Sequence, residues 1–205
     1  MQHGGNSIEG FVGDVKGVIL LDNEGQRIIA KYYNNKGTQF ETNQNQKDFE
    51  KQLFLKSSKQ SAGSKSNNSY ENDIMTVDNY VSIFRSYSDM TIFIVGLADD
   101  NELILGLVLD CIHECFDRIF KGQIERRSLI NNMSGVILVI DELFDQGIIM
   151  NLDANIILSR IKTGKSSSSS GHASSGQSES GGGSSILLSY VFSSARSQLD
   201  KTLGM

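Results

Sequence analysis

The chain has 205 residues without a single proline, a net charge of −5 at pH 7, 39% hydrophobic and 21% charged residues. This composition suffices for one globular domain with a hydrophobic core, and it excludes a disordered chain. The two cysteines exclude a disulfide scaffold, and the acidic balance argues against nucleic acid as the main partner, because nucleic-acid binding usually leaves a basic footprint.

The first residues, MQHGGNSIEG, lack the basic start and apolar run of a signal peptide. The longest apolar stretch, residues 90–98, is too short to cross a bilayer, which takes about 20 residues. We therefore expect a cytosolic protein whose thiols stay reduced.

The first half of the chain predicts strands in hairpins. Residues 14–21 and 27–33 are apolar runs joined by the turn Asp22-Asn-Glu-Gly25, which is typical of a β-hairpin. Phe49 and Leu53 indicate a short amphipathic helix over 47–56, and a long polar loop is expected over 57–72. Three more strands are predicted, over residues 74–77, 80–87 and 90–97, in a sheet covered on both faces.

From residue 100 the apolar period becomes helical. One helix is predicted after the Asp99-Asp-Asn101 cap, and a second over about 124–145 with Gly147 as its C-cap. Asp153 is expected to cap a short third helix. Strands in hairpins followed by helices in a block predict an α+β fold with an antiparallel sheet.

The ends of the chain differ from this body in composition. Residues 164–185 contain eleven Ser and six Gly, which predicts a flexible linker. The expected organisation is a disordered N-terminus (1–13), a folded domain (14–163), the linker (164–185) and a short C-terminal helix or tail (186–205).

Catalytic residues are scarce. His113 is the one histidine in the predicted body, between Cys111 and Cys115 on one helix. The two cysteines share a helix face while His113 points the other way, so two core cysteines and a surface histidine are expected. A Cys/His enzyme stays open as a remote alternative. No spacing indicates a metal site, and no cofactor or small-molecule substrate is expected.

Several segments together resemble a known family. Residues 15–33, VKGVILLDNEGQRIIAKYY, resemble the opening hairpin of the small subunits of clathrin-adaptor and coatomer complexes. The segments FEK (49–51), FLK (54–56), ERRSLINNMSG (125–135) and VIDELFDQG (139–147) are similar to the zeta small subunits of coatomer. The resemblance covers about residues 14–163, and the shared order of the segments carries it.

The resemblance implies a longin-like fold, a five-stranded antiparallel sheet with helices on both faces. It also implies a role in the COPI coat, without catalysis. A zeta subunit pairs with the trunk of the coatomer gamma subunit, within a beta/gamma/delta/zeta subcomplex. An Arf-family GTPase recruits this coat to the cytosolic face of Golgi membranes, for Golgi-to-ER and intra-Golgi vesicle transport.

Such a role predicts apolar surface for the partner. The candidates are two tyrosines of the second strand, the tyrosine that ends the fourth predicted strand and four apolar residues after Gly147, namely Tyr32, Tyr33, Tyr87, Ile148, Ile149, Met150 and Leu152. A clathrin-adaptor sigma subunit or another longin trafficking protein remains the alternative within the same fold class.

Overall fold

Five strands form one antiparallel sheet in the order β2-β1-β5-β4-β3. The computed structural model describes residues 14–63 and 71–163. The predicted N-terminus (1–13), linker (164–185) and C-terminal helix or tail (186–205) lie outside the described residues. The strand bounds are β1 Gly17–Asp22, β2 Arg27–Tyr32, β3 Asp73–Val77, β4 Tyr80–Ser86 and β5 Met90–Leu97.

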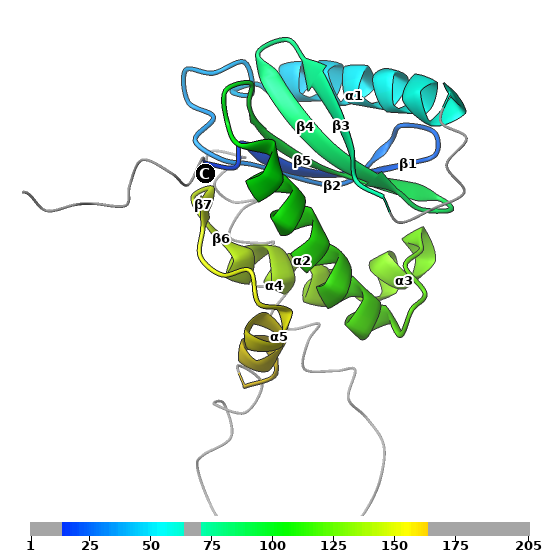
Figure 1. Ribbon diagram of the computed structural model, residues 1–205, viewed down its shortest axis with the longest axis vertical. Helices are drawn as coiled ribbons and strands as arrows, with labels where there is room; N and C mark the ends of the chain where they lie inside the picture. The colour runs from blue at the N-terminus through cyan, green and yellow to red at the C-terminus, as the bar shows by residue number, and fades with distance from the viewer. Residues whose placement is uncertain (1–13, 64–70, 164–205) are drawn as a thin grey trace, which may run out of the picture. The chain divides into compact units, whose positions relative to one another are not determined.

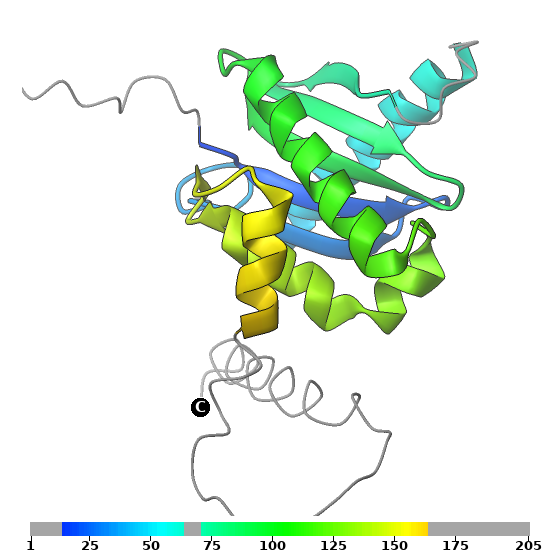
Figure 2. The same ribbon diagram turned by 60° about the horizontal axis from the view of Figure 1, so that its bottom comes forward.

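Helices cover both faces of this sheet, as the continuous apolar strands predict. Helix α1 (Asn43–Gly63) lies on one face, whereas α2 (Glu102–Phe120) and α4 (Met133–Leu143) lie on the other (Figures 1 and 2). The short α3 (Arg126–Asn131) precedes α4, and α5 (Ala154–Thr163) follows it on the α2 side. The α+β prediction with a five-stranded antiparallel sheet is confirmed.

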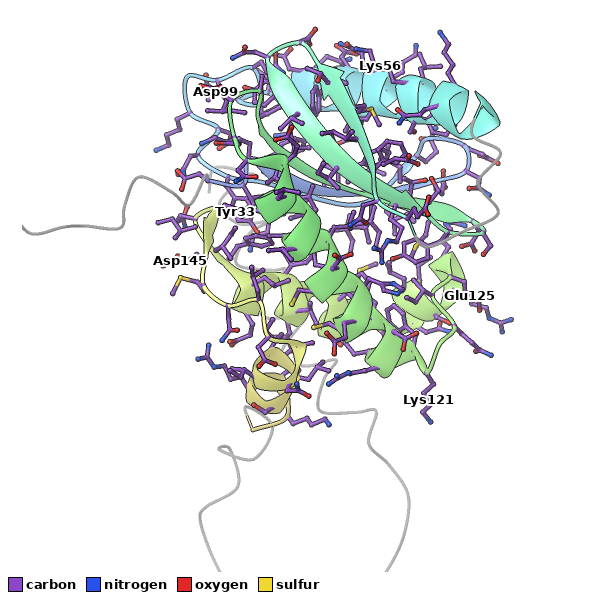
Figure 3. All side chains as sticks on the ribbon, viewed as in Figure 1. Tyr33, Lys56, Asp99, Lys121, Glu125 and Asp145 are labelled. Carbon is purple, nitrogen blue, oxygen red and sulfur yellow. The ribbon has the colours of Figure 1, made fainter. Side chains whose placement is uncertain are left out.

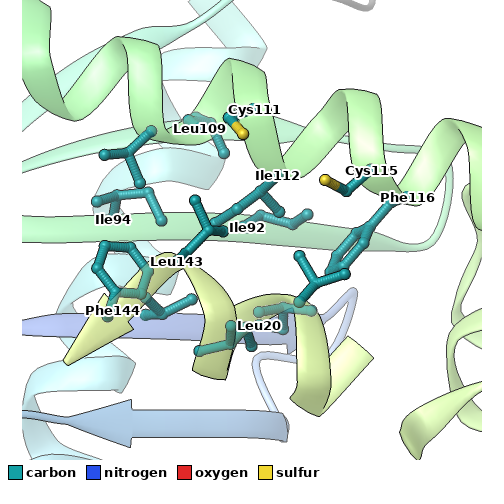
Figure 4. Packing of buried hydrophobic residues seen from close by; sticks show 14 of the residues in the cluster. Leu20, Ile92, Ile94, Leu109, Cys111, Ile112, Cys115, Phe116, Leu143 and Phe144 are labelled. Atoms are coloured by element: carbon teal, nitrogen blue, oxygen red, sulfur yellow. The ribbon is translucent and has the colours of Figure 1, made fainter. Parts of the chain in front are cut away.

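Each face of the sheet has its own hydrophobic core, because successive side chains of a strand point to opposite faces. Leu20 of β1 packs with Ile112 of α2 and Leu143 of α4, in the larger core drawn in Figure 4. Its neighbour Ile19 packs instead with Leu53 of α1, in the smaller core. A fully buried Leu or Ile contributes about 1.5–3 kcal/mol, so both cores stabilise the sheet.

A buried ion pair fastens α1 to β2. The Glu50 carboxylate of α1 is 3% exposed and accepts hydrogen bonds from Arg27 Nε (2.9 Å) and from the Tyr32 hydroxyl (2.9 Å). Burying a carboxylate is costly unless it is paired and hydrogen-bonded, and both conditions are met here. The ring of Tyr32 also lies 4.8 Å from that of Phe40, which closes the smaller core.

Helix α1 is longer than predicted, and the polar loop expected over 57–72 is wrong in its first part. The helix continues to Gly63 because its last turns have tertiary partners. Lys56 Nζ donates to the Thr76 carbonyl (2.9 Å), and Gln60 Nε2 donates to the Ile74 carbonyl (3.2 Å). These contacts with β3 stabilise a polar helix that its own apolar pattern does not predict.

The helix predicted over 124–145 is interrupted. It consists of α3 and α4, which meet at Asn132, a residue with φ −117° and ψ 26° outside the helical region. The Asp89 carboxylate accepts a hydrogen bond from the Arg126 N–H, which anchors the start of α3 to the β4–β5 turn. Gly147 is no helix cap, because α4 ends at Leu143 and a small hairpin follows.

Both edges of the sheet are protected against further strand pairing. On β3, the carbonyls of Ile74 and Thr76 accept the side-chain hydrogen bonds from α1. On β2, a β-bulge inserts Ile28, since Leu20 pairs with Ile29 but Leu21 with Arg27. Bulges and covered carbonyls are two of the devices by which natural edge strands avoid pairing with another chain.

Candidate interaction surface

A two-stranded hairpin follows α4 and builds the candidate surface. Its strands, β6 (Phe144–Asp145) and β7 (Ile148–Ile149), are joined by Gln146 and Gly147. Both turn residues have positive φ, 51° and 95°. Two consecutive positive φ values are the signature of a type I′ turn, whose twist matches that of the strands and which favours glycine.

The hairpin is fixed beside the sheet by hydrogen bonds to the carbonyls of its two turn residues. The Val15 N–H donates to the Gly147 carbonyl (2.9 Å), and Asn34 Nδ2 donates to the Gln146 carbonyl (2.8 Å). A Cβ on Gly147 would lie 2.5 Å from the Val15 carbonyl oxygen, which is closer than van der Waals contact allows. Glycine at 147 therefore permits the hairpin to pack against the start of β1.

This anchoring presents apolar side chains to solvent. The exposed fractions are 51% for Ile148, 58% for Met150 and 37% for Leu152. Ile156 of α5 is 41% exposed, and we call these four residues the 148–156 strip. Ile149 lies between them and packs against the larger core. Ile148, Met150 and Leu152 are thus exposed and Ile149 is partly buried, and partner binding by these four residues stays a prediction.

Asp153 connects the strip to α5. Its Oδ1 accepts a hydrogen bond from the Asn155 N–H (2.8 Å), which is the arrangement of an N-cap and confirms the sequence prediction. This backbone hydrogen bond lowers the pKa of the Asp153 carboxyl. Ala154 and Ile157 are buried and hold the first turns of α5 on the larger core.

Tyr33 does not belong to the exposed surface, and the expectation of an exposed ring there is wrong. The residue is 5% exposed, and its ring packs against Phe144 at 5.6 Å. Lys31 Nζ lies 5.2 Å from the ring centroid, in a cation–π arrangement. Burial raises the pKa of Tyr33, whose ring supports the β6–β7 hairpin from beneath (Figure 3).

Tyr32 and Tyr87 lie away from the strip. Tyr32 faces α1, on the opposite side of the sheet, where burial raises the pKa of its hydroxyl. Tyr87 follows β4 at the end of the sheet away from Val15, and its hydroxyl lies 3.0 Å from Nδ1 of His113. Burial raises the pKa of Tyr87 to about 12 and lowers that of His113. The two tyrosines are half-buried parts of the fold.

Two exposed leucines escaped the sequence analysis. Leu103 and Leu107 of α2 are 77% and 56% exposed. They stand one helical turn apart on the outer side of α2, the side that carries Asp110 and Glu114 further along. An apolar pair in the polar stripe of an amphipathic helix is the signal that could have found them.

The cysteines lie in the core. Cys111 and Cys115 are 4% and 0% exposed, and Figure 4 shows both among the residues of the larger core. The hydrogen bond with Cys111 and burial raise the pKa of the Cys115 thiol, so it stays protonated at neutral pH. His113 lies 3.0 Å from the Tyr87 hydroxyl through its Nδ1.

The same described residues also bear on metal binding and on membrane spanning. Within residues 14–63 and 71–163, no group of three or more His, Cys, Asp or Glu side chains could hold a metal ion. None of the helices in this part of the chain is both long and apolar enough to cross a membrane.

Comparison with known proteins identifies the class to which the fold belongs. Residues 14–167 match the family described as "Clathrin adaptor complex small chain", and the chain belongs to this family. It is thus a small chain of the coat-adaptor type. The likeness extends to a chain in a homology model of the full-length AP-3 complex, with a TM-score of 0.52 at 16% identity, over 75% of this chain and 95% of that one. This likeness confirms the longin-like fold.

Several of its relatives are zeta subunits of coatomer. The probable coatomer subunit zeta-A of Dictyostelium discoideum is 35% identical over 153 residues, which are 74% of this chain and 81% of the relative. Coatomer subunit zeta of Saccharomyces cerevisiae is 32% identical over 72% of this chain and 76% of its own length. The human coatomer subunit zeta-1 is 29% identical with the same two coverages.

Proposed function

We propose that this chain is the zeta subunit of a coatomer coat and that it binds the trunk of the gamma subunit through the 148–156 strip. The similarity to zeta subunits over most of the folded domain supports the coatomer role. The observation that carries the binding surface is the exposure of Ile148 and Met150 on a hairpin that is fixed to the sheet.

Ile148 and Met150 are exposed to water until a partner covers them. Two exposed side chains of this size gain about 1–2 kcal/mol each when a partner covers them, at about 25 cal/mol per Å² of apolar area. The backbone beneath them is held by Val15 and Leu143, so little ordering entropy is lost on binding. A preformed apolar surface such as the 148–156 strip suits the inner curve of a helical solenoid, the form we propose for the gamma trunk.

The remaining parts of the proposal follow from membership of the coat. The chain acts without catalysis, as a structural and adaptor subunit within a beta/gamma/delta/zeta subcomplex. An Arf-family GTPase brings this subcomplex to the cytosolic face of Golgi membranes. The coat then forms vesicles for Golgi-to-ER and intra-Golgi transport.

The test is co-expression of the full chain with a coatomer gamma trunk, followed by size-exclusion chromatography with light scattering. A stable 1:1 complex is expected. The double variant Ile148→Ser/Met150→Ser should weaken the affinity by at least about tenfold, equivalent to 1.4 kcal/mol. The matched control Ile74→Ser changes an isoleucine of similar exposure, 45%, on β3, and should leave the affinity unchanged.

Three results would contradict the proposal. A folded chain that never associates with the gamma trunk would refute the subunit role. Association with a clathrin-adaptor large chain in its place would favour the sigma-type alternative. Equal loss of affinity in the double variant Ile148→Ser/Met150→Ser and in Ile74→Ser would refute the strip as the binding surface while leaving the role intact.

A further inference from the structure

The solvent side of α1 is basic in a chain whose net charge is −5. Four exposed lysines, at positions 47, 51, 56 and 59, lie on this helix. Its two acidic residues are Asp48, which is exposed, and Glu50, which is buried and paired with Arg27. The exposed side of α1 thus has an excess of three positive charges, opposite in sign to the chain as a whole.

Three of these lysines have no structural role in the described fold. Lys56 donates to the Thr76 carbonyl and protects the edge of β3. Lys47, Lys51 and Lys59 form no ion pair with any residue in the described ranges. They follow one another at four and eight residues along one side of the helix, a stripe about 18 Å long at 1.5 Å per residue.

From this stripe we propose that α1 contacts the surface of an anionic membrane, a proposal that rests on the coat role proposed above. The contact uses the ammonium groups of Lys47, Lys51 and Lys59 at the level of the lipid phosphates. Lysines near an anionic leaflet contribute about 1 kcal/mol each, so three of them give a weak contact that acts together with other attachments of a coat.

The position of α1 supports this role. The 148–156 strip and helices α2, α4 and α5 lie on the other face of the sheet, so a partner bound there leaves α1 uncovered (Figures 1 and 2). In Figure 3, Lys56 marks the α1 side, whereas Tyr33 and Asp145 mark the hairpin. The exposed acids of α2, Asp110 and Glu114, stand beyond the sheet, and salt screens charges separated by more than about 10 Å at 0.1 M.

The chemistry of the stripe favours a membrane over an acidic protein. A protein interface needs a buried apolar centre, usually with several aromatic or aliphatic side chains. The α1 stripe offers one, Leu55, which is 48% exposed between Lys51 and Lys59. The other exposed residues of the helix are polar, such as Gln44 and Gln52. One leucine among lysines on an outward helix face fits the boundary between headgroups and acyl chains.

The experiment measures binding of the full chain to vesicles of phosphatidylcholine with and without phosphatidylserine, by flotation over a range of lipid concentrations at about 0.1 M salt, where the Debye length is about 10 Å. Binding is expected only with phosphatidylserine and should disappear at high salt. The variant K47Q/K51Q/K59Q should lose more than about tenfold in the partition coefficient, since three lysine contributions are removed.

A matched control changes the net charge equally at other sites. K36Q/K121Q/K162Q removes three exposed lysines outside α1 and should keep wild-type partitioning. Equal loss in both triple variants, or no binding of the wild-type chain to phosphatidylserine vesicles, would overturn the proposal. Loss of binding to a polyglutamate peptide, with vesicle binding unchanged, would assign α1 to an acidic protein segment and also overturn it.

The outcome is separable from that of the gamma-trunk test. K47Q/K51Q/K59Q should bind the gamma trunk with wild-type affinity, because α1 lies across the sheet from the 148–156 strip. If vesicle binding fails and trunk binding stands, only the membrane contact is refuted. If trunk binding fails in the wild-type chain, the coat role is refuted first.

Discussion

Replacing Gly147 with alanine should destabilise the chain through a single close contact. Gly147 has φ +95°, and a Cβ there would lie 2.5 Å from the Val15 carbonyl oxygen and 3.0 Å from Tyr33 Cβ. An L-residue in a left-handed conformation costs about 1–2 kcal/mol. Moving the hairpin away also weakens the hydrogen bond from the Val15 N–H, worth about 1 kcal/mol.

The expected loss for Gly147→Ala is therefore about 2–3 kcal/mol in the free energy of unfolding. For a domain of this size, that corresponds to a Tm lower by about 4–12 °C. Urea unfolding of the full chain, followed by circular dichroism, measures the first quantity and thermal unfolding the second. The same variant should bind the gamma trunk more weakly, because Ile148 and Met150 move with the hairpin.

Gly37→Ala is the matched control. Gly37 also has a positive φ, +70°, but no heavy atom lies within 4 Å of the position of its Cβ. Alanine there should cost about 1 kcal/mol or less, because a stiffer unfolded chain offsets part of the strain. Equal destabilisation by Gly147→Ala and Gly37→Ala would refute the reasoning, because the close contact with the Val15 carbonyl oxygen would then add nothing to the cost of a positive φ.

Three further perturbations test other parts of the structure. Glu50→Ala leaves Arg27 and the Tyr32 hydroxyl without their carboxylate and should lower the free energy of unfolding in urea by about 2–3 kcal/mol. Asp141→Asn, in an exposed pair with Lys31, should lower it by less than about 0.5 kcal/mol. Similar losses in the two variants would contradict a stabilising role of the buried pair. Burial, with Arg85 nearby, lowers the His113 pKa below its ordinary 6.5, so the native state binds fewer protons than the unfolded chain. Stability should thus fall as the pH drops through about 6.5, and His113→Gln should reduce that slope in urea unfolding at a series of pH values; an unchanged slope would count against it. Cys111 and Cys115, 4% and 0% exposed, should resist a thiol reagent at neutral pH until denaturant is added, as followed by mass spectrometry. Rapid labelling of the native chain would favour the alternative of a Cys/His enzyme.

The elements whose residues face one core throughout could be predicted from the sequence. The β1–β2 hairpin and α2 carry unbroken apolar patterns, and the structure places them where the patterns do. The predicted Asp153 cap is present for a similar reason, because an N-cap uses residues that are neighbours in the chain.

The errors occur where distant contacts decide. The last turns of α1 contact carbonyls of β3, and the start of α3 is anchored by the Asp89 carboxylate of the β4–β5 turn. The apolar period runs on through Asn132, so periodicity alone predicts one helix. Gly147 has the local look of a helix cap, and only its contact with Val15 reveals a hairpin turn.

The candidate surface was predictable as a segment but not in its details. Within β7, Ile148 faces water and Ile149 packs against the larger core, and Met150 and Leu152 beyond the strand are exposed. Consecutive Tyr32 and Tyr33 looked equivalent in sequence, yet they point to opposite faces of the sheet, one bonded to Glu50 and the other packed on Phe144. Alternation along the strand separates them, and the pairing of β2 with β1 decides which of the two faces α1.

The protected sheet edges affect how the chain behaves before it is assembled with a partner. With the β3 carbonyls bonded to Lys56 and Gln60, and β2 distorted at Ile28, neither edge offers a template on which a second copy could add its strands. Growth of this sheet into fibrils by strand addition is therefore disfavoured while the chain is unassembled, and the 148–156 strip stays exposed for the binding proposed above.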